Sequence, residues 1–359
     1  MTARVLGLPR GTSSPGHVLS KTTALLLVAK SALHANLRKA HKQEEEPTED
    51  MELGTLAHEL MLGKGHGFEV AEYVAPPTAD ESLAALVEQF DADQGAALLP
   101  DAPPESTKQA KAKGGRKRKP PAPPEPPPMG PDGHPEWPDW RRKDAQSARD
   151  AIRARGLLPV LPRTLRAAKA GVARCRERML GDFGIVLDGE SEIAVEWSEY
   201  ASDGDEVTCW GAIDHYRSGV IYDLKFVRSA HLKSCAAHIV AYGGDIQAAA
   251  YLRAFEQLAP DMAGRLSFVF LFCELGSGAV TPVPMSGSFL QLGNMRWRRA
   301  IETWARCRRT NRWPAYVTEP VALEAPEYAM AEEMSVWLND SALASRAPAY
   351  YENEVPDGA

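Results

Sequence analysis

Apolar residues recur at helical spacing near the start of the chain. In the stretch SKTTALLLVAKSALHANLRKA (20–40) this pattern predicts a helix, with Ser20 as its N-cap. A second helix is predicted over residues 51–63. Its apolar positions, three and four residues apart, are Leu53, Leu56, Ala57, Leu60 and Met61.

After residue 190 the period of the pattern changes to two. Three such runs follow one another, joined by short polar links: EIAVEWSEY (192–200), TCWGAIDHY (208–216) and VIYDLKFV (220–227). Alternation of apolar and polar residues is typical of β-strands, and the short links predict an antiparallel meander.

Further predicted elements flank the meander in the sequence. Helices are expected within 140–180, over 244–258 and over 294–310, and the run LSFVFLFCE (266–274) predicts a buried strand. Strands with helices on both sides predict an α/β or α+β core.

The composition changes between residues 79 and 140. Thirteen of the chain's 28 prolines lie between Pro100 and Pro138, together with the basic run KQAKAKGGRKRK (108–119). Such a segment buries too little apolar surface to order itself, so we predict a largely disordered insertion over 79–140. The basic run either contacts a phosphate backbone or is a solvated linker, and linkers are the more common case.

The other predicted segments are a flexible N-terminus (1–17), a helical part (18–78), a core (141–345) and a C-terminal tail (346–359). The composition is that of an ordinary globular protein, with 44% hydrophobic and 25% charged residues. The net charge of −7 does not indicate a nucleic-acid-binding protein, although a local basic groove remains compatible with it.

The five cysteines are widely spaced and form no CxxC pair. We therefore expect neither a zinc ribbon nor an iron–sulfur cluster. The sequence contains no apolar signal-peptide core and no run of membrane-spanning length. The expectation is a soluble cytoplasmic protein that does not associate with membranes.

The clearest candidate chemistry lies in the last two strands of the meander. Asp223 and Lys225 are two residues apart, so they point to the same face of an otherwise apolar strand. A tight hairpin would place Asp214 of the preceding strand close to Asp223. Facing carboxylates repel unless a cation lies between them, and Mg²⁺ is bound in this way. The alternative is a surface ion pair, but the apolar flanks disfavour it because buried charges are costly.

The run GAID, with DLK eight residues later, resembles the signature of the PD-(D/E)xK nuclease superfamily. GTLAH (54–58) is similar to the G-T-x-x-H helix motif of its RecB-like branch, and QAAAY (247–251) to the Q-x-x-x-Y motif. Over roughly residues 18–320 the chain resembles RecE-type (exonuclease VIII C-terminal domain-like) phage and prophage exodeoxyribonucleases. Phe226 departs from that pattern, because Thr or Ser often follows the lysine in the family.

The resemblance implies a restriction-endonuclease-like core, in which helices flank a central mixed β-sheet, with an N-terminal helical section. It implies Mg²⁺, or Mn²⁺ in its place, at a catalytic centre where Lys225 acts on the attacking water. The implied metal ligands are His58, Asp214, Asp223 and the Leu224 carbonyl. The implied supporting residues are Gln247, Tyr251 and Glu192, with Glu196 as the rival of Glu192.

The implied activity is 5′→3′ degradation of linear double-stranded DNA, which leaves a 3′ single strand for a recombinase or a single-strand annealing protein. Such enzymes act as a homo-oligomeric ring, in a bacterial or phage-infected cell. Basic residues at 141–143 and 296–299 are candidates to line its channel, or they are solvated helix faces. The alternatives are a RecB-like or Cas4-like module of a larger repair complex, and a non-catalytic DNA-end-binding protein of the same fold.

Overall fold

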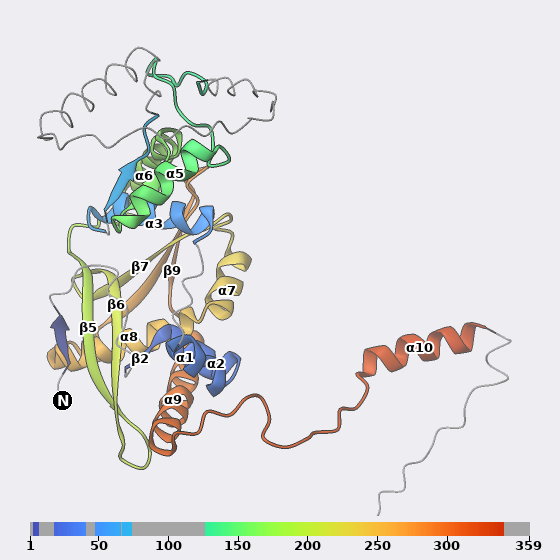
Figure 1. Cartoon of the computed structure of the whole chain (residues 1–359). Coiled ribbons are helices and arrows are strands. Elements are labelled where there is room, and N and C mark those ends of the chain that lie inside the picture. The colour runs from blue at the N-terminus through green and yellow to red at the C-terminus, as the bar shows by residue number, and fades with distance from the viewer. Residues whose placement is uncertain (1–2, 7–17, 41–46, 66, 74–125, 341–359) are drawn as a thin grey trace, which may run out of the picture. The chain divides into compact units, whose positions relative to one another are not determined.

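The computed structural model describes residues 3–6, 18–40, 47–65, 67–73 and 126–340. The chain divides into two compact units, Met1–Arg312 and Trp313–Ala359. The described part of the second unit contains helix α10 (Glu327–Asn339), which has no buried residue. The other described helices and strands belong to the first unit (Figure 1).

A mixed β-sheet forms the centre of the first unit. Along its main path the first four strands pair antiparallel, the fifth pairs parallel to the fourth, and the sixth pairs antiparallel to the fifth. A short additional strand pairs parallel to the third. In spatial order the strands are β1 (Arg4–Leu6), β5 (Glu190–Tyr200), β6 (Glu206–Arg217), β7 (Val220–Phe226), β8 (Ser267–Cys273) and β9 (Val280–Pro284), with β2 (Leu19–Ser20) beside β6. The predicted meander is confirmed as β5–β6–β7, and so is the α/β class.

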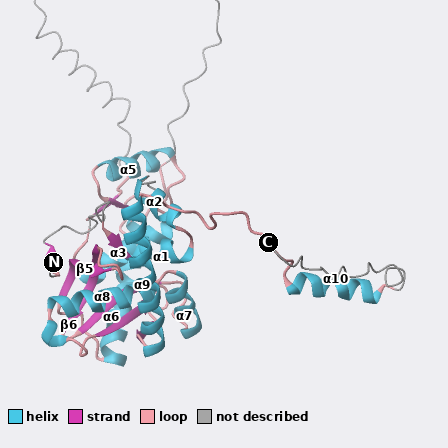
Figure 2. Cartoon of the chain, turned by 90° about the horizontal axis from the view of Figure 1, so that it is seen from below, coloured by secondary structure: helices cyan, strands magenta, loops and turns pink. Residues whose placement is uncertain are grey.

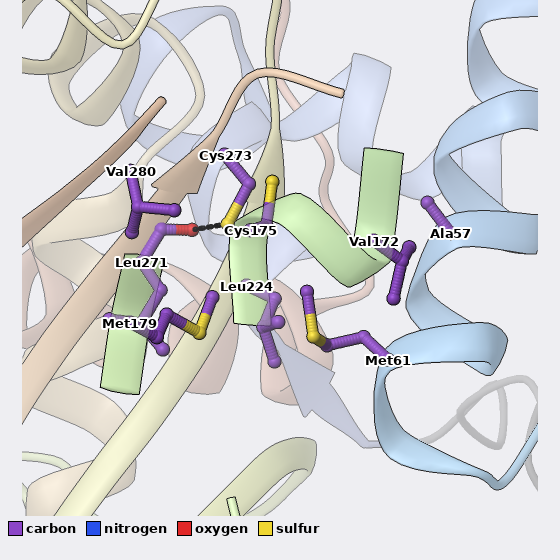
Figure 3. Close-up of a cluster of buried hydrophobic side chains, with 9 residues drawn as sticks. All are labelled: Ala57, Met61, Val172, Cys175, Met179, Leu224, Leu271, Cys273 and Val280. Carbon is purple, nitrogen blue, oxygen red and sulfur yellow. Dashed lines mark hydrogen bonds between the residues drawn. The ribbon is translucent and has the colours of Figure 1, made fainter. Parts of the chain in front are cut away.

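Helices α3 (Glu49–Leu62) and α6 (Pro162–Phe183) cover one face of the sheet at β7, β8 and β9. Figure 3 shows the buried side chains that join them. These are Ala57 and Met61 of α3, Val172, Cys175 and Met179 of α6, and Leu224, Leu271, Cys273 and Val280 of the strands. This packing fixes the position of α3 against β7.

Helices α1 (Lys21–Ala29), α7 (Leu232–Ala241), α8 (Gly244–Leu258) and α9 (Gly287–Thr310) belong to the opposite face. There the ring of Tyr251 on α8 packs against Phe268 of β8, and His238 on α7 packs against Phe272. Helices α8 and α9 lie side by side (Figure 2). They approach closely at Gly293, where a Cβ would overlap the Asp245 carbonyl group.

A small second sheet stands apart from the central one. Strands β3 (Phe68–Val70) and β4 (Leu158–Val160) pair parallel, next to helix α5 (Lys143–Ala154). A cluster around Trp137, which is 4% exposed, packs beneath them. Its ring meets Tyr73 edge-on at 5.7 Å.

The disordered insertion was predicted to extend too far, because this cluster contains residues of its last part. Residues 126–140 were assigned to it on their proline content, yet Trp137 is buried among apolar side chains. The rest of that prediction, 79–125, lies outside the described residues, and so does the predicted tail, 346–359. The predicted flexible N-terminus also needs correction, because Arg4–Leu6 forms β1 at the edge of the sheet.

Several predicted helix boundaries differ from the structure. The helix expected over 20–40 is two helices, α1 and α2 (Ala32–Ala40), which separate at Lys30. Ser20 caps the first as predicted, since its hydroxyl accepts the Thr23 N–H. The helical region expected within 140–180 contains strand β4, and α9 begins seven residues before the predicted start at 294. Among the described helices none is long and apolar enough to cross a membrane.

Candidate metal and catalytic site

The central sheet opens between β6 and β7, and the candidate site lies at that opening. The two strands are paired at Arg217–Val220, Tyr216–Ile221 and His215–Tyr222. One step further the same register places Asp214 opposite Asp223. There the ladder ends, and the Leu224 N–H donates to Asp214 Oδ2 at 2.8 Å instead of to a backbone carbonyl.

Helix α3 brings His58 to the opening, where the imidazole lies between two carboxylates. His58 Nε2 is 2.9 Å from Asp214 Oδ2, and His58 Nδ1 is 3.2 Å from Glu192 Oε1. One ligand atom from each of the three residues lies within 4.8 Å of the others. His58 is 8% exposed, so these groups meet largely out of solvent.

Glu192 reaches this position through an unusual backbone conformation. Its φ is 59°, in the left-handed region, although it lies within β5. A non-glycine residue there costs roughly 1–3 kcal/mol and persists only when its surroundings hold it. The rival candidate, Glu196, pairs with Arg4 at 2.7 Å. The structure therefore brings Glu192, and not Glu196, to His58 and Asp214.

A second group of side chains surrounds Asp223, which is 2% exposed. The Lys225 ammonium pairs with one oxygen of the Asp223 carboxylate, and the Gln247 side-chain amide donates to the other. Lys225 Nζ also lies over the ring of Phe270, 5.5 Å from its centroid. Of the residues predicted on α8, Gln247 thus contacts Asp223 directly.

Tyr251, the second predicted residue on α8, is placed differently. Its ring lies against β6 at Gly211, where a Cβ would overlap it. Burial raises the pKa of the Tyr251 hydroxyl, and the carboxylates of Asp223 and Asp214 add to the increase. The phenol therefore stays protonated, and its contacts serve the packing of α8 on β6.

The charges of the two groups influence one another. Burial alone would raise the pKa of Asp214, but His58, Lys225 and the Leu224 N–H together hold it below its usual value. Burial raises the pKa of Asp223, against the opposing effect of Lys225. For Lys225 burial lowers the pKa, but Asp223 and Asp214 outweigh it and raise the pKa above its usual value. Lys225 is therefore held as an ammonium ion.

Two charged residues near the site carry no sequence signal that pointed to them. Lys21, in the first turn of α1, has its pKa lowered to about 8 by burial and by Lys225, against the effect of nearby carboxylates that include Asp223. Asp245 of α8 is fully buried and pairs with Arg296 at 3.1 Å, while its Oδ1 is buried without a hydrogen-bond partner. Neither belongs to a spaced motif, so only the tertiary structure reveals them.

The basic residues proposed to line a DNA channel mostly serve internal contacts. Besides the Arg296–Asp245 pair, Arg299 donates to the Val28 carbonyl at 2.9 Å and Trp297 is 1% exposed. The remaining such contacts are those of Arg298 with the Tyr200 carbonyl and Glu302, of Arg141 with Asp139 and of Arg142 with Asp144. The 296–299 segment is thus part of the fold of α9.

The donor set of the first group fits a divalent cation. Two carboxylates and an imidazole are ligands that Mg²⁺ or Mn²⁺ accepts, and the three converge on one point. Asp223 stands outside this group, because Lys225 and Gln247 occupy its oxygens. Leu224 contributes its N–H to Asp214, and its carbonyl stays a predicted ligand.

No protein-family model and no curated protein matches the chain. Among solved structures, a "putative exonuclease" from Eubacterium rectale is similar, with 12% sequence identity over 91% of this chain and 98% of that chain. The TM-score is 0.47. This value is too low to establish a shared fold, so the function is inferred from the site residues.

Proposed function

We propose that the chain is a metal-dependent deoxyribonuclease that hydrolyses phosphodiester bonds. The observation that carries the proposal is the convergence of His58, Glu192 and Asp214 beside the Asp223–Lys225 pair on adjacent strands. Three metal-binding groups next to a partly exposed ammonium ion suit a phosphate, because the substrate is anionic and its hydrolysis develops further negative charge.

Mg²⁺, or Mn²⁺ in its place, would be held by His58, Asp214 and Glu192, and would supply an activated water and charge neutralisation. The Leu224 carbonyl is a further predicted ligand, and so is Asp223 once the metal displaces Lys225 or Gln247 from one of its oxygens. Lys225, which is 23% exposed and protonated, faces the opening and would orient the water and stabilise the charge on the phosphate. Gln247 fixes the Asp223 carboxylate through its amide.

Within this class we place the protein among exodeoxyribonucleases that act on linear double-stranded DNA in the 5′→3′ direction. The support is the order GTLAH, GAID, DLK and QAAAY along the chain. On this proposal the product is a 3′ single strand for phage-type recombination, a single-strand annealing protein is the partner, and the enzyme works as a homo-oligomeric ring.

The proposal is tested with the purified chain, Mg²⁺ and linear duplex DNA. We expect release of nucleotides, and we expect Asp223→Ala and Lys225→Ala each to reduce it by a factor of 100 or more, on the order of the contribution of one charge-stabilising group. Glu196→Gln is the matched control, because Glu196 lies on the same strand as Glu192 but pairs with Arg4.

Full activity of either the Asp223 or the Lys225 variant would refute the mechanism. Duplexes labelled at the 5′ or the 3′ end then decide the direction of digestion. Closed circular duplex is expected to resist, and its digestion would contradict an exonuclease.

One observation favours the non-catalytic alternative, a protein that binds DNA ends. The carboxylates of the site are already engaged by its own side chains, since His58 contacts two of them and Asp223 is engaged by Lys225 and Gln247. The two functions differ in whether a metal displaces these contacts. A nuclease is expected to gain thermal stability with Mn²⁺, as a ligand of the native state does, and Asp214→Asn is expected to lose that gain.

A further inference from the structure

A cavity of about 600 Å³ opens beside the candidate site and has no role in the proposed hydrolysis. Four elements form its walls: the end of β7, the first half of α3, helix α7 and the turn between β8 and β9. The volume lies in the range of pockets that take small organic groups. Its ligand can be inferred from its position, its charges and its aromatic wall.

The cavity is continuous with the site on two elements. On β7, Phe226 lines the cavity and directly follows Lys225, so the two side chains leave opposite faces of the strand close to its end. On α3, Gly54 lines it and lies four residues before His58, so both are on the same side of the helix. His238 on α7 also lines it, and Lys225 contributes, after burial, to lowering the pKa of that imidazole. A group in the cavity therefore lies at the end of β7 and one helical turn of α3 away from His58.

The charges that line the cavity do not favour a phosphate there. Arg228 is paired with Asp50, and Glu274 adds a second carboxylate, which accepts the Ala230 N–H at 2.6 Å and the Ser277 hydroxyl at 2.7 Å. His238 has a pKa lowered to about 4 and is neutral at physiological pH. The lining thus carries two acidic charges against one basic charge, which suits an uncharged group.

The aromatic wall suits a flat ring. Phe226 packs against the cluster that includes Leu224, stays only partly buried there, and lines the cavity. A nucleobase stacks well on such a ring, and stacking tolerates any base because each has a π-face. Ser229, Ser234 and Ser277 also line the cavity, and serine hydroxyl groups can hydrogen-bond to the edge of a base.

We infer that this cavity takes one nucleobase of the strand being hydrolysed, stacked on Phe226 at the end of β7, while a phosphate of the same strand lies at Lys225. The inference rests on the proposed function for the identity of the strand. It also gives a reason for Phe226 after the lysine, since a Thr or Ser at that position offers no ring for stacking.

The test is a binding experiment that needs no cleavage. A labelled single-stranded tetranucleotide of thymidine and its fully abasic counterpart are titrated with the full chain in EDTA, at one fixed salt concentration. We expect the intact strand to bind more tightly by roughly 5- to 150-fold, the value of stacking one base. Equal affinity for the two strands would overturn the inference.

Two matched pairs of variants locate the effect. Gly54→Phe fills the cavity and is expected to abolish the preference for the intact strand, while Gly54→Ala keeps it, because nothing lies within 4 Å of the added Cβ. Both replace a glycine inside a helix, where it is unfavourable, so neither is expected to unfold α3. Phe226→Leu is expected to lose the preference and Phe226→Tyr to retain it.

An undiminished preference in Gly54→Phe would place the base elsewhere and refute the inference. The outcomes also separate this inference from the proposed function. If the chain cleaves DNA with a metal but shows no preference for the intact strand, only the inference of a base in the cavity is refuted. If Gly54→Phe abolishes such a preference but the chain never cleaves DNA, only the proposed nuclease activity is refuted.

Discussion

Gly211 is one residue on which the position of α8 depends, because the ring of Tyr251 occupies the space where a Cβ would be. We predict that Gly211→Ala lowers the free energy of unfolding by about 1–3 kcal/mol, the usual cost of overpacking a core. Denaturant unfolding measures it. Gly181→Ala on α6 is the control, since nothing lies within 4 Å of its added Cβ. Equal stabilities of the two variants would contradict the close packing of Tyr251 on Gly211.

His238 links stability to pH. Burial, Lys225 and Lys21 lower its pKa from 6.5 to about 4. Between pH 6.5 and 4 the imidazole is therefore protonated in the unfolded chain but neutral in the folded chain. The contribution of His238 to the free energy of unfolding is complete above pH 6.5 and is lost as the pH falls toward 4.

We predict that His238→Gln flattens the pH dependence of the melting temperature between pH 6.5 and 4. Melting curves at pH 7.5, where the imidazole is neutral in both states, report the packing cost of the substitution alone. An unchanged slope in the acidic range would show that His238 does not carry this linkage.

Strand β5 and helix α8 are joined by an ion pair whose carboxylate is buried and whose arginine side chain is 43% exposed. Glu199 is 3% exposed and receives two hydrogen bonds from Arg253, at 2.6 and 2.7 Å. The indole N–H groups of Trp197 and Trp297 donate to the same carboxylate at 3.4 and 3.3 Å. Removal of Arg253 would leave this carboxylate buried without its counter-charge.

We predict that Arg253→Ala destabilises the protein by about 1–3 kcal/mol, the cost of removing a partner from a buried polar group; the exposure of the arginine side chain keeps the loss below that of a fully buried pair. Arg178→Ala is the control, because the Arg178–Asp182 pair on α6 is about half exposed on both sides and is expected to contribute less than about 1 kcal/mol. Denaturant titrations measure both. A similar loss in the two variants would mean that the buried charge is not the cause.

The elements that sequence predicted well are those with a long, regular pattern. Strands β5, β6 and β7 alternate over seven to twelve residues, and α8 matches the predicted range 244–258. Helix α7 was not predicted, and the break between α1 and α2 leaves no proline or glycine as a signal. The order around Trp137 was missed because prolines dominate the local composition, while the contacts that hold it come from Tyr73 and α5.

The same distinction applies to the site. His58, Asp214, Asp223, Lys225 and Gln247 stand in spaced motifs, and the structure brings them together; their catalytic roles stay predictions. Glu192 could be chosen over Glu196 only from the structure, because both lie on β5 and only Glu192 takes the left-handed conformation. Lys21 and Asp245 become significant only through the fold around them, which no local spacing encodes.

At the scale of the whole chain, the first compact unit is expected to fold without the second. The described hydrophobic clusters around α3, α5 and α6 all lie before Arg312. We predict that a chain ending at Arg312 unfolds cooperatively, with a melting temperature close to that of the full chain. Circular dichroism on heating is the measurement.

A chain ending at Ala300 is the control, since it removes the buried side chains of Ile301, Trp304 and Cys307 from α9. It is expected to lose the cooperative transition. Loss of that transition already in the chain ending at Arg312 would show that the first unit needs the residues that follow it.

The distance along the chain between His58 and its partners also determines when the site can form during synthesis. Glu192 is 192 − 58 = 134 residues further on, and Gln247 is 247 − 58 = 189. At about 5–20 residues per second a ribosome needs roughly 7–27 s for the first interval. Throughout it Ala57 and Met61 on α3 lack the central β-sheet strands against which they pack in the folded protein. Any activity of the site is therefore withheld until β5, β6, β7 and α8 have left the ribosome.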